Sequence, residues 1–185
     1  MITRLLIYMT LTLLTFAAAT IEAAHDSEQE GDLLKAVFIY NFAKFTRWPT
    51  NTWGEIQNPL VICSIGNDRL TNKLEKLNGK TISGHLVTTN HQNIETFTPV
   101  GCHLLYIASS MSNDTHSILQ SLQNRPILTV SGLPGFSQSG GMIELKQDKD
   151  KIRFIINLRT ARDAGLELSA RLLNLATVVE GGKEK

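Results

Sequence analysis

The apolar positions of residues 31–48 follow the three- and four-residue spacing of an amphipathic helix. Lys35, Lys44 and Arg47 fall outside the apolar face, and Pro49 is expected to end the helix because it cannot continue the backbone hydrogen bonding. The face is bulky and aromatic, so it can pack into a core, or part of it can meet a partner. Its members are Leu34, Val37, Phe38, Phe42, Phe45 and Trp48.

Short apolar runs alternate with segments of helical spacing through the middle of the chain. This alternation is typical of an α/β fold with a largely parallel sheet. Asn67 or Asp68 is a suitable N-cap for the first of these helices, and Gly79 follows its end. The strands are expected over residues 60–65, 81–88, 102–108 and 127–130, and the helices over residues 67–77 and 112–123.

The last third of the chain predicts a β-hairpin followed by a helix. Two strands over residues 142–145 and 152–157 flank a polar turn. Residues 160–179 then carry apolar side chains at helical spacing, which predicts one long closing helix. No internal repeat or linker divides this region. The sequence therefore predicts a single α/β domain with a mixed, mostly parallel sheet flanked by helices, a C-terminal β-hairpin and a long helix.

The first 24 residues have the layout of a secretory signal peptide. Arg4 provides a positive start, residues 5–19 carry no charge, and small residues precede a rise in polarity at His25. The uncharged run is shorter than the roughly 18 residues that a membrane-spanning helix needs, so an uncleaved anchor is the weaker alternative. We assign residues 1–24 to a signal peptide and residues 25–185 to an exported α/β domain in the periplasm.

Composition narrows the classes of partner. The chain has 18 Lys and Arg residues against 17 Asp and Glu residues. This balance argues against a nucleic-acid partner, because affinity for nucleic acids comes largely from neutralising phosphates. Hydrophobic residues make up 42% of the chain and charged residues 19%, as in globular rather than disordered proteins.

The motifs that resemble catalytic signatures are incomplete. The segment 79–81 resembles the end of a phosphate-binding loop, but Leu74 stands where that motif requires glycine. The segment 135–139 has Ser139 where a hydrolase nucleophile elbow requires glycine. No two of the five histidines have the i, i+4 spacing of helical metal ligands. We therefore expect no enzyme activity, no cofactor and no metal site.

Cys63 and Cys102 are the only cysteines in the chain. A single pair is expected to bond in an oxidising compartment, and both cysteines fall on strands expected in one sheet. In the chain-entropy model, closing a loop of this length stabilises the fold by at most about 4 kcal/mol. The sequence favours a disulfide, with two buried free thiols as the alternative.

Four residues are candidates for binding a partner or ligand. Arg47 and Arg159 can hold an anion, because the planar guanidinium binds carboxylate or phosphate bidentately, although both can also be plain helix-end charges. Trp48 closes the apolar face of the first helix. Phe136 lies in the glycine-rich loop 131–141, after a strand, where open α/β sheets place ligands. It either forms an exposed anchor for a partner or tucks under its own loop.

Three segments resemble the YfiR-like family of periplasmic repressors. Residues 35–49 (KAVFIYNFAKFTRWP) resemble its opening motif, residues 140–145 (GGMIEL) its glycine-rich hairpin, and residues 154–175 its closing segment. The best-known members carry a second disulfide, and here only the positions of Cys63 and Cys102 match. We therefore expect no redox control that depends on a second pair in this chain.

The resemblance implies a function that the residues alone do not give. It implies a periplasmic repressor, without catalytic activity, that binds the periplasmic domain of a membrane-bound diguanylate cyclase. Binding would lower cyclic di-GMP signalling and biofilm formation. The resemblance also implies an outer-membrane protein that sequesters the repressor. The sequence leaves the oligomeric state open, and a homodimer is one option.

The second hypothesis is a periplasmic small-molecule receptor with an anion-binding pocket. It places the ligand at the loop 131–141, with Arg47 and Arg159 as the anion-binding groups. A concave pocket lined by both arginines would favour it. The two roles can coexist, since a ligand can tune the binding of a partner.

The signal-peptide assignment predicts a new amino terminus between residues 20 and 25. Small residues at Ala19, Ala23 and Ala24 offer sites for signal peptidase. The measurement is the intact mass of protein taken from a periplasmic extract. Retention of Met1 in that protein would contradict the assignment.

Overall fold

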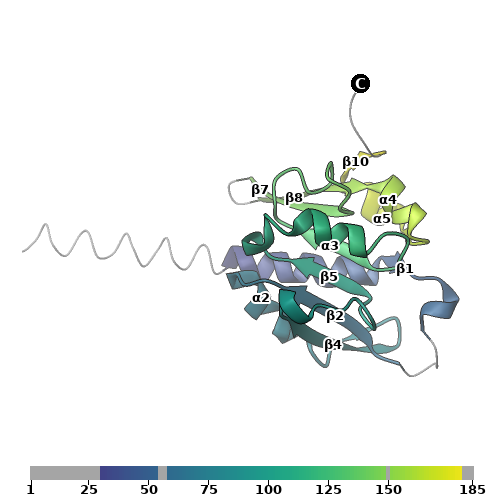
Figure 1. Ribbon diagram of the computed structural model, residues 1–185. Helices are drawn as coiled ribbons and strands as arrows, with labels where there is room; N and C mark the ends of the chain where they lie inside the picture. Colours follow the sequence, from purple (N-terminus) through teal and green to yellow (C-terminus); the bar gives the residue numbers. More distant parts are fainter. Residues whose placement is uncertain (1–29, 54–57, 149–150, 181–185) are drawn as a thin grey trace, which may run out of the picture.

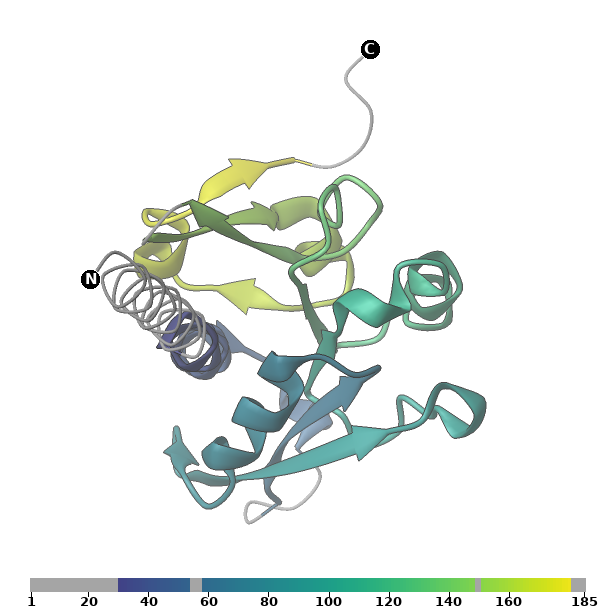
Figure 2. The same cartoon turned by 90° about the vertical axis from the view of Figure 1, so that its left-hand side faces the viewer.

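The computed structural model describes residues 30–53, 58–148 and 151–180, so the predicted signal peptide lies outside the described residues. Within these ranges one eight-stranded sheet is flanked by helices on both faces (Figures 1 and 2), which confirms the α/β class. The order across the sheet is β10 (Thr177–Val179), β8 (Lys151–Asn157), β7 (Ile143–Asp148), β6 (Leu128–Ser131), β5 (Leu104–Ile107), β2 (Leu60–Ile65), β4 (His85–Gln92) and β3 (Thr81–Ile82).

The centre of the sheet is parallel and its flanks are mixed. β4, β2, β5, β6 and β7 run parallel, whereas β3 is antiparallel to β4 and β8 is antiparallel to β7. Every residue of β5 and β6 is buried, as expected for strands covered on both faces. The predicted strand over residues 60–65 and the predicted hairpin of β7 and β8 are confirmed.

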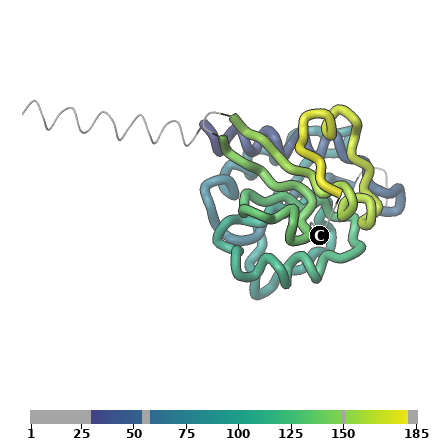
Figure 3. Tube along the Cα trace, turned by 90° about the horizontal axis from the view of Figure 1, so that it is seen from above, coloured from purple at the N-terminus to yellow at the C-terminus, as the bar shows by residue number. Residues whose placement is uncertain are grey.

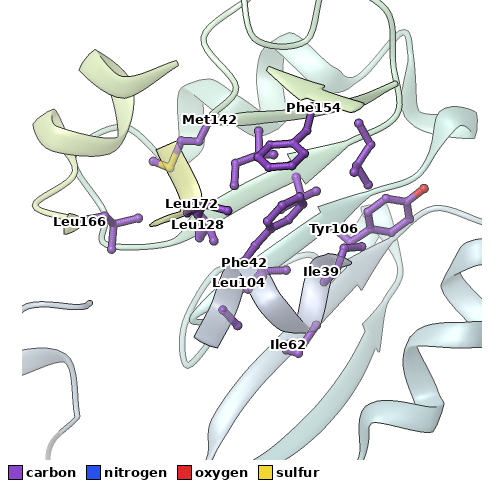
Figure 4. Packing of buried hydrophobic residues seen from close by; sticks show 14 of the residues in the cluster. Ile39, Phe42, Ile62, Leu104, Tyr106, Leu128, Met142, Phe154, Leu166 and Leu172 are labelled. Carbon is purple, nitrogen blue, oxygen red and sulfur yellow. The ribbon is translucent and has the colours of Figure 1, made fainter. Parts of the chain in front are cut away.

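The sheet separates two hydrophobic clusters, one on each face, and helices cover both. The helix over residues 30–44, α2 (Arg69–Leu74) with η2 (Glu75–Leu77), and α4 (Leu158–Asp163) contribute to the larger cluster. At its centre the rings of Phe42 and Phe154 meet edge to face, with centroids 4.9 Å apart (Figure 4). α3 (Thr115–Ser121) covers the opposite face of the sheet and contributes to the smaller cluster. The first helix and α3 therefore lie on opposite sides of the sheet (Figures 2 and 3).

The first helix buries a face that only partly matches the predicted one. Phe42 is buried as predicted, but so are Ala36, Ile39 and Ala43, while Leu34 and Val37 are 41% and 45% exposed. The helix is apolar almost all round, so its periodicity did not identify which side meets the sheet. It ends at residue 44 rather than 48, and the chain continues as the short strand β1 (Thr46–Arg47).

The prediction of one strand over residues 81–88 is wrong. Ser83 and Gly84, with φ of 51° and 90°, form a turn that separates β3 from β4. The preceding helix is confirmed as α2 and η2. Asp68 caps its start by accepting a hydrogen bond from the Thr71 amide, and Gly79 lies beyond its end with a φ of 77°.

The prediction of one long closing helix is also wrong, because the segment forms four short elements. Gly165, with a φ of 76°, ends α4, and the chain then forms β9 (Glu167–Leu168). The Ser169 side chain caps α5 (Ala170–Leu173) by accepting from the Leu172 amide, and β10 follows. Several apolar residues of these pieces, among them Ala161, Ala164 and Leu172, pack into the larger cluster at spacings that resemble those of a single helix, whereas Leu175 is 70% exposed.

The predicted disulfide is present between Cys63 of β2 and Cys102, which lies just before β5. Their Cα atoms are 5.7 Å apart, within the normal range for a disulfide. The Gln92 amide lies 3.7 Å and 3.5 Å from the two sulfur atoms. The bond therefore links two neighbouring strands inside the smaller cluster.

Phe136 is buried, so the prediction of an exposed anchor is wrong and the tucked-in alternative holds. Its side chain is 1% exposed and packs against the backbone of Gly141, where a side chain would collide with the ring. The loop is held in place because Glu144 accepts hydrogen bonds from the amide and hydroxyl of Ser137, at 3.1 Å and 2.9 Å. Phe136 is thus part of the core.

Replacing Phe136 with alanine should lower the free energy of unfolding by about 3–5 kcal/mol, because it removes a fully buried ring and leaves a cavity. Urea unfolding followed by circular dichroism measures the change. Leu133→Ala, at a partly buried position of the same loop, is the control and should cost clearly less. Similar unfolding midpoints for both variants would contradict the packing.

Candidate functional site

A cleft of about 410 Å³ lies between the carboxyl end of the first helix, β9 and the start of β2 and β4. It is therefore at the amino-terminal ends of the central strands, not beside the glycine-rich loop at their carboxyl ends. Its lining includes Phe45, Arg47, Trp48, Trp53, His85 and Ser169.

Arg47 is held at the rim of the cleft by the pairing of β1 with β9. This pairing places Arg47 opposite Glu167, and the Arg47 Nη1 atom lies 3.1 Å from Glu167 Oε2. Both side chains are more than 70% exposed, and a surface ion pair of this kind contributes little to stability. Arg47 can therefore exchange Glu167 for an anionic group on a partner or ligand.

Aromatic rings form one wall of the cleft. The Trp53 ring stacks on His85 at 4.1 Å and on His103 at 4.7 Å between centroids. Trp48 meets Trp53 edge-on at 5.8 Å, and its indole nitrogen donates a hydrogen bond to the His103 carbonyl. The side chain of Trp48 is 5% exposed, so it supports the wall more than it faces solvent.

His103 is the buried member of this aromatic group. Its Nδ1 accepts a hydrogen bond from the Val61 amide at 3.1 Å, which places the proton of the neutral ring on Nε2. Nε2 has no hydrogen-bond partner among the described residues. Burial, and secondarily the nearby His85, lower the pKa of His103 from 6.5 to about 4. The ring is therefore neutral at physiological pH.

The structure brings together two of the four predicted binding residues. Arg47 and Trp48 line the same cleft. Arg159 lines a separate depression of about 190 Å³ with Arg162, and Phe136 lies in the core. The prediction of an anion site formed by both Arg47 and Arg159 beside the glycine-rich loop is therefore wrong. The binding role of Arg47 and Trp48 remains a prediction.

Sequence reasoning did not place Trp53, His85 and His103 in one site. Trp53 follows the short 3-10 helix η1 (Thr50–Thr52), His85 begins β4 and His103 directly precedes β5, so the order of strands in the sheet brings them together. Cys102 and His103 are neighbours in sequence and project in opposite directions, as residues of an extended segment do. One joins the disulfide and the other the aromatic wall.

In the part of the chain that the structure describes, no cluster of three or more His, Cys, Asp or Glu residues is arranged to hold a metal ion. No helix there has the length and apolar character required to cross a membrane.

Comparison with known protein families gives a match to the YfiR/HmsC-like family over residues 32–177. The chain belongs to the YfiR/HmsC-like family. The matched range includes most of the first helix, the disulfide and the aromatic cleft, and it confirms the resemblance seen in the sequence. No curated protein matches the chain. The YfiR/HmsC-like family is known for periplasmic regulation of diguanylate cyclases, and it is regulatory rather than catalytic.

Acid should destabilise this YfiR/HmsC-like domain through His103. The pKa of this ring is about 4 in the folded protein and ordinary, near 6.5, in the unfolded chain. Between these values only the unfolded state takes up the proton, so the free energy of unfolding falls as the pH drops from 6.5 towards 4. The loss from this group approaches roughly 3 kcal/mol at the acid limit.

Urea unfolding at pH 7 and pH 4.5 tests this expectation. In His103→Gln the titrating group is absent, so the difference between the two pH values should shrink. His91→Gln, at an exposed histidine, is the control and should keep the wild-type difference. An unchanged pH dependence in His103→Gln would rule His103 out as the cause.

Proposed function

We propose that this protein is a periplasmic repressor that binds the periplasmic domain of a membrane-bound diguanylate cyclase and lowers cyclic di-GMP signalling and biofilm formation. The observation that carries the proposal is the family match over residues 32–177. The site itself supports binding rather than chemistry. Its prominent groups are an exposed arginine and aromatic rings, and two polar residues of its lining are engaged elsewhere: Ser169 caps α5, and His85 Nδ1 lies 2.8 Å from the Asn58 carbonyl.

The cleft beside Arg47 is the surface that we assign to the cyclase. Arginine and aromatic residues are enriched at the centres of protein interfaces. Here Arg47 lies at the rim, Phe45 and Leu168 are half-buried, and Trp53 forms the wall. This arrangement fits a protruding segment of the partner that carries a carboxylate next to an apolar side chain. An outer-membrane protein that occupies the same surface would release the cyclase.

A small-molecule receptor is the second candidate, and the dimensions of the cleft favour it. A volume of about 410 Å³ is within the range of pockets that hold small ligands. A ligand with an anionic group would meet Arg47, and a planar ring would find Trp53 and His85. Such a ligand would compete with the cyclase for the same cleft.

Deleting the gene should raise cyclic di-GMP in the native host, and restoring the wild-type gene should lower it again. Arg47→Glu should fail to restore repression, because the reversed charge repels a partner's carboxylate and weakens binding by roughly tenfold or more. Arg159→Glu is the matched control, an exposed arginine outside the cleft, and it should restore repression. Cyclic di-GMP levels are measured by mass spectrometry in each strain.

Binding of the purified exported protein to the periplasmic domain of the cyclase separates the two candidates. If deletion leaves cyclic di-GMP unaltered and no cyclase domain binds, the repressor proposal fails. A protein that binds only a small anionic ligand, in a manner dependent on Arg47, would be a receptor.

A further inference from the structure

A second cavity, of about 290 Å³, lies between α3, the glycine-rich loop and α4 (both helices are labelled in Figure 1). One face of α3 and the residues after it form a wall, since His116, Leu119, Gln120 and Gln123 recur at spacings of three and four. No described residue lines both this cavity and the Arg47 cleft. The cavity is therefore separate from the surface assigned to the cyclase, and the inference goes beyond the proposed function.

The rim of this cavity offers hydrogen bonds from uncharged side chains. Gln120, Gln123 and Asn124 contribute three primary amides, each of which carries two donors and an acceptor oxygen. Ser139, from the glycine-rich loop, and Thr160, from α4, contribute hydroxyl groups that both donate and accept. Such a rim suits a neutral molecule that is rich in hydrogen-bond donors and acceptors.

The remaining lining argues against an anionic ligand. Asp163 is its one carboxylate and His116 its one imidazole, and no lysine or arginine of the described chain lines the cavity. An anion would lose part of its hydration there without meeting a cation. Leu119, Met142 and Ala164 add apolar patches. The lining therefore combines neutral polar groups with surfaces that can cover the carbon–hydrogen face of a ring.

Thr129 of β6 supplies a separate observation that points to a ligand. Its side chain is only 2% exposed, yet it lines the cavity. The hydroxyl oxygen accepts a hydrogen bond from the Met142 amide at 3.0 Å, and no group of the described chain accepts the hydroxyl proton. A buried donor without an acceptor is costly. An oxygen atom of a molecule bound in the cavity would satisfy it.

We propose that this cavity binds a neutral sugar. The hydroxyl groups of a sugar ring stand on neighbouring carbons, so one amide or carboxylate side chain can bond two of them at once, and the ring face can rest on the apolar patches. A volume of about 290 Å³ is at the lower end of small-ligand pockets and suits one or two rings. A peptide would also satisfy amides, but peptides are usually bound along a strand edge or an open groove.

Titration of N-acetylglucosamine into the isotope-labelled exported protein tests the site, with amide chemical shifts as the readout. Residues that line the cavity should shift in a saturable manner, with a Kd of about 0.1–10 mM, as expected for a small ligand with few contacts. Glucuronic acid, which is ionised at neutral pH, should bind at least roughly tenfold more weakly, because its carboxylate meets no cation.

Removal of the amides locates the binding. The double variant Gln120→Ala, Gln123→Ala should bind N-acetylglucosamine at least roughly tenfold more weakly, since several hydrogen bonds are lost. Both glutamines are exposed, so the fold should persist, and thermal unfolding checks this. Gln138→Ala is the matched control: this glutamine is exposed in the same loop as Ser139 but does not line the cavity, and the variant should bind like the wild type.

Three results would overturn the proposal. Absence of shifts up to about 50 mM N-acetylglucosamine, well above the expected Kd, would mean that the cavity holds only solvent. Shifts that the double variant leaves unchanged would place the sugar elsewhere. Binding of the peptide probe N-acetylalanine amide, without binding of the sugar, would assign the amides to a peptide chain.

Discussion

The parallel pairing of β2 with β5 is the contact on which the rest of the structure depends. β2 is flanked by β5 on one side and β4 on the other, so it joins the early and late halves of the sheet. The two residues that directly precede β5, Cys102 and His103, are held on opposite faces of the sheet. On one face Cys102 is bonded to Cys63, and on the other His103 accepts a hydrogen bond from the Val61 amide. Two adjacent residues therefore fix the same pair of strands from opposite sides.

This arrangement links the core to the site. His103 carries a carbonyl that accepts from Trp48 and a ring that stacks on Trp53, so the wall of the cleft rests on the start of β5. The disulfide restricts the same stretch of backbone from the other cluster. The position of the cleft wall is therefore coupled to the covalent link, although the disulfide itself is buried away from the cleft.

The elements that could be predicted are those whose determinants lie close together in the sequence. The central strands were predictable because full burial on both faces leaves continuous apolar runs, and the α2 cap was predictable because Asp68 acts within its own turn. The closing segment was not, since one glycine and one serine divide it while its apolar spacing survives. Phe136 was ambiguous because a glycine five residues later decides whether its ring can turn inwards.

The candidate site could be predicted only at its rim. Arg47 and Trp48 follow the first helix directly, and local reasoning identified them. Trp53, His85 and His103 come together through strand order, which no spacing in the sequence encodes. Arg159 has the same chemistry as Arg47 but lies in α4, directly after β8, and it lines another depression. Residue type thus indicated the chemistry, and topology alone determined which residues could share a cleft.

Two structural requirements shape the first helix. One side must pack closely on the sheet, which Ala36 and Ala43 allow because their side chains are small. The carboxyl end must lead directly into β1, so that Arg47 meets β9 at the rim of the cleft. The remaining side is free of the sheet and yet apolar at Leu33 and Val37. The helix is therefore shaped by its sheet-facing side and by its carboxyl end, whereas its third side carries aliphatic residues that neither the core nor the cleft requires.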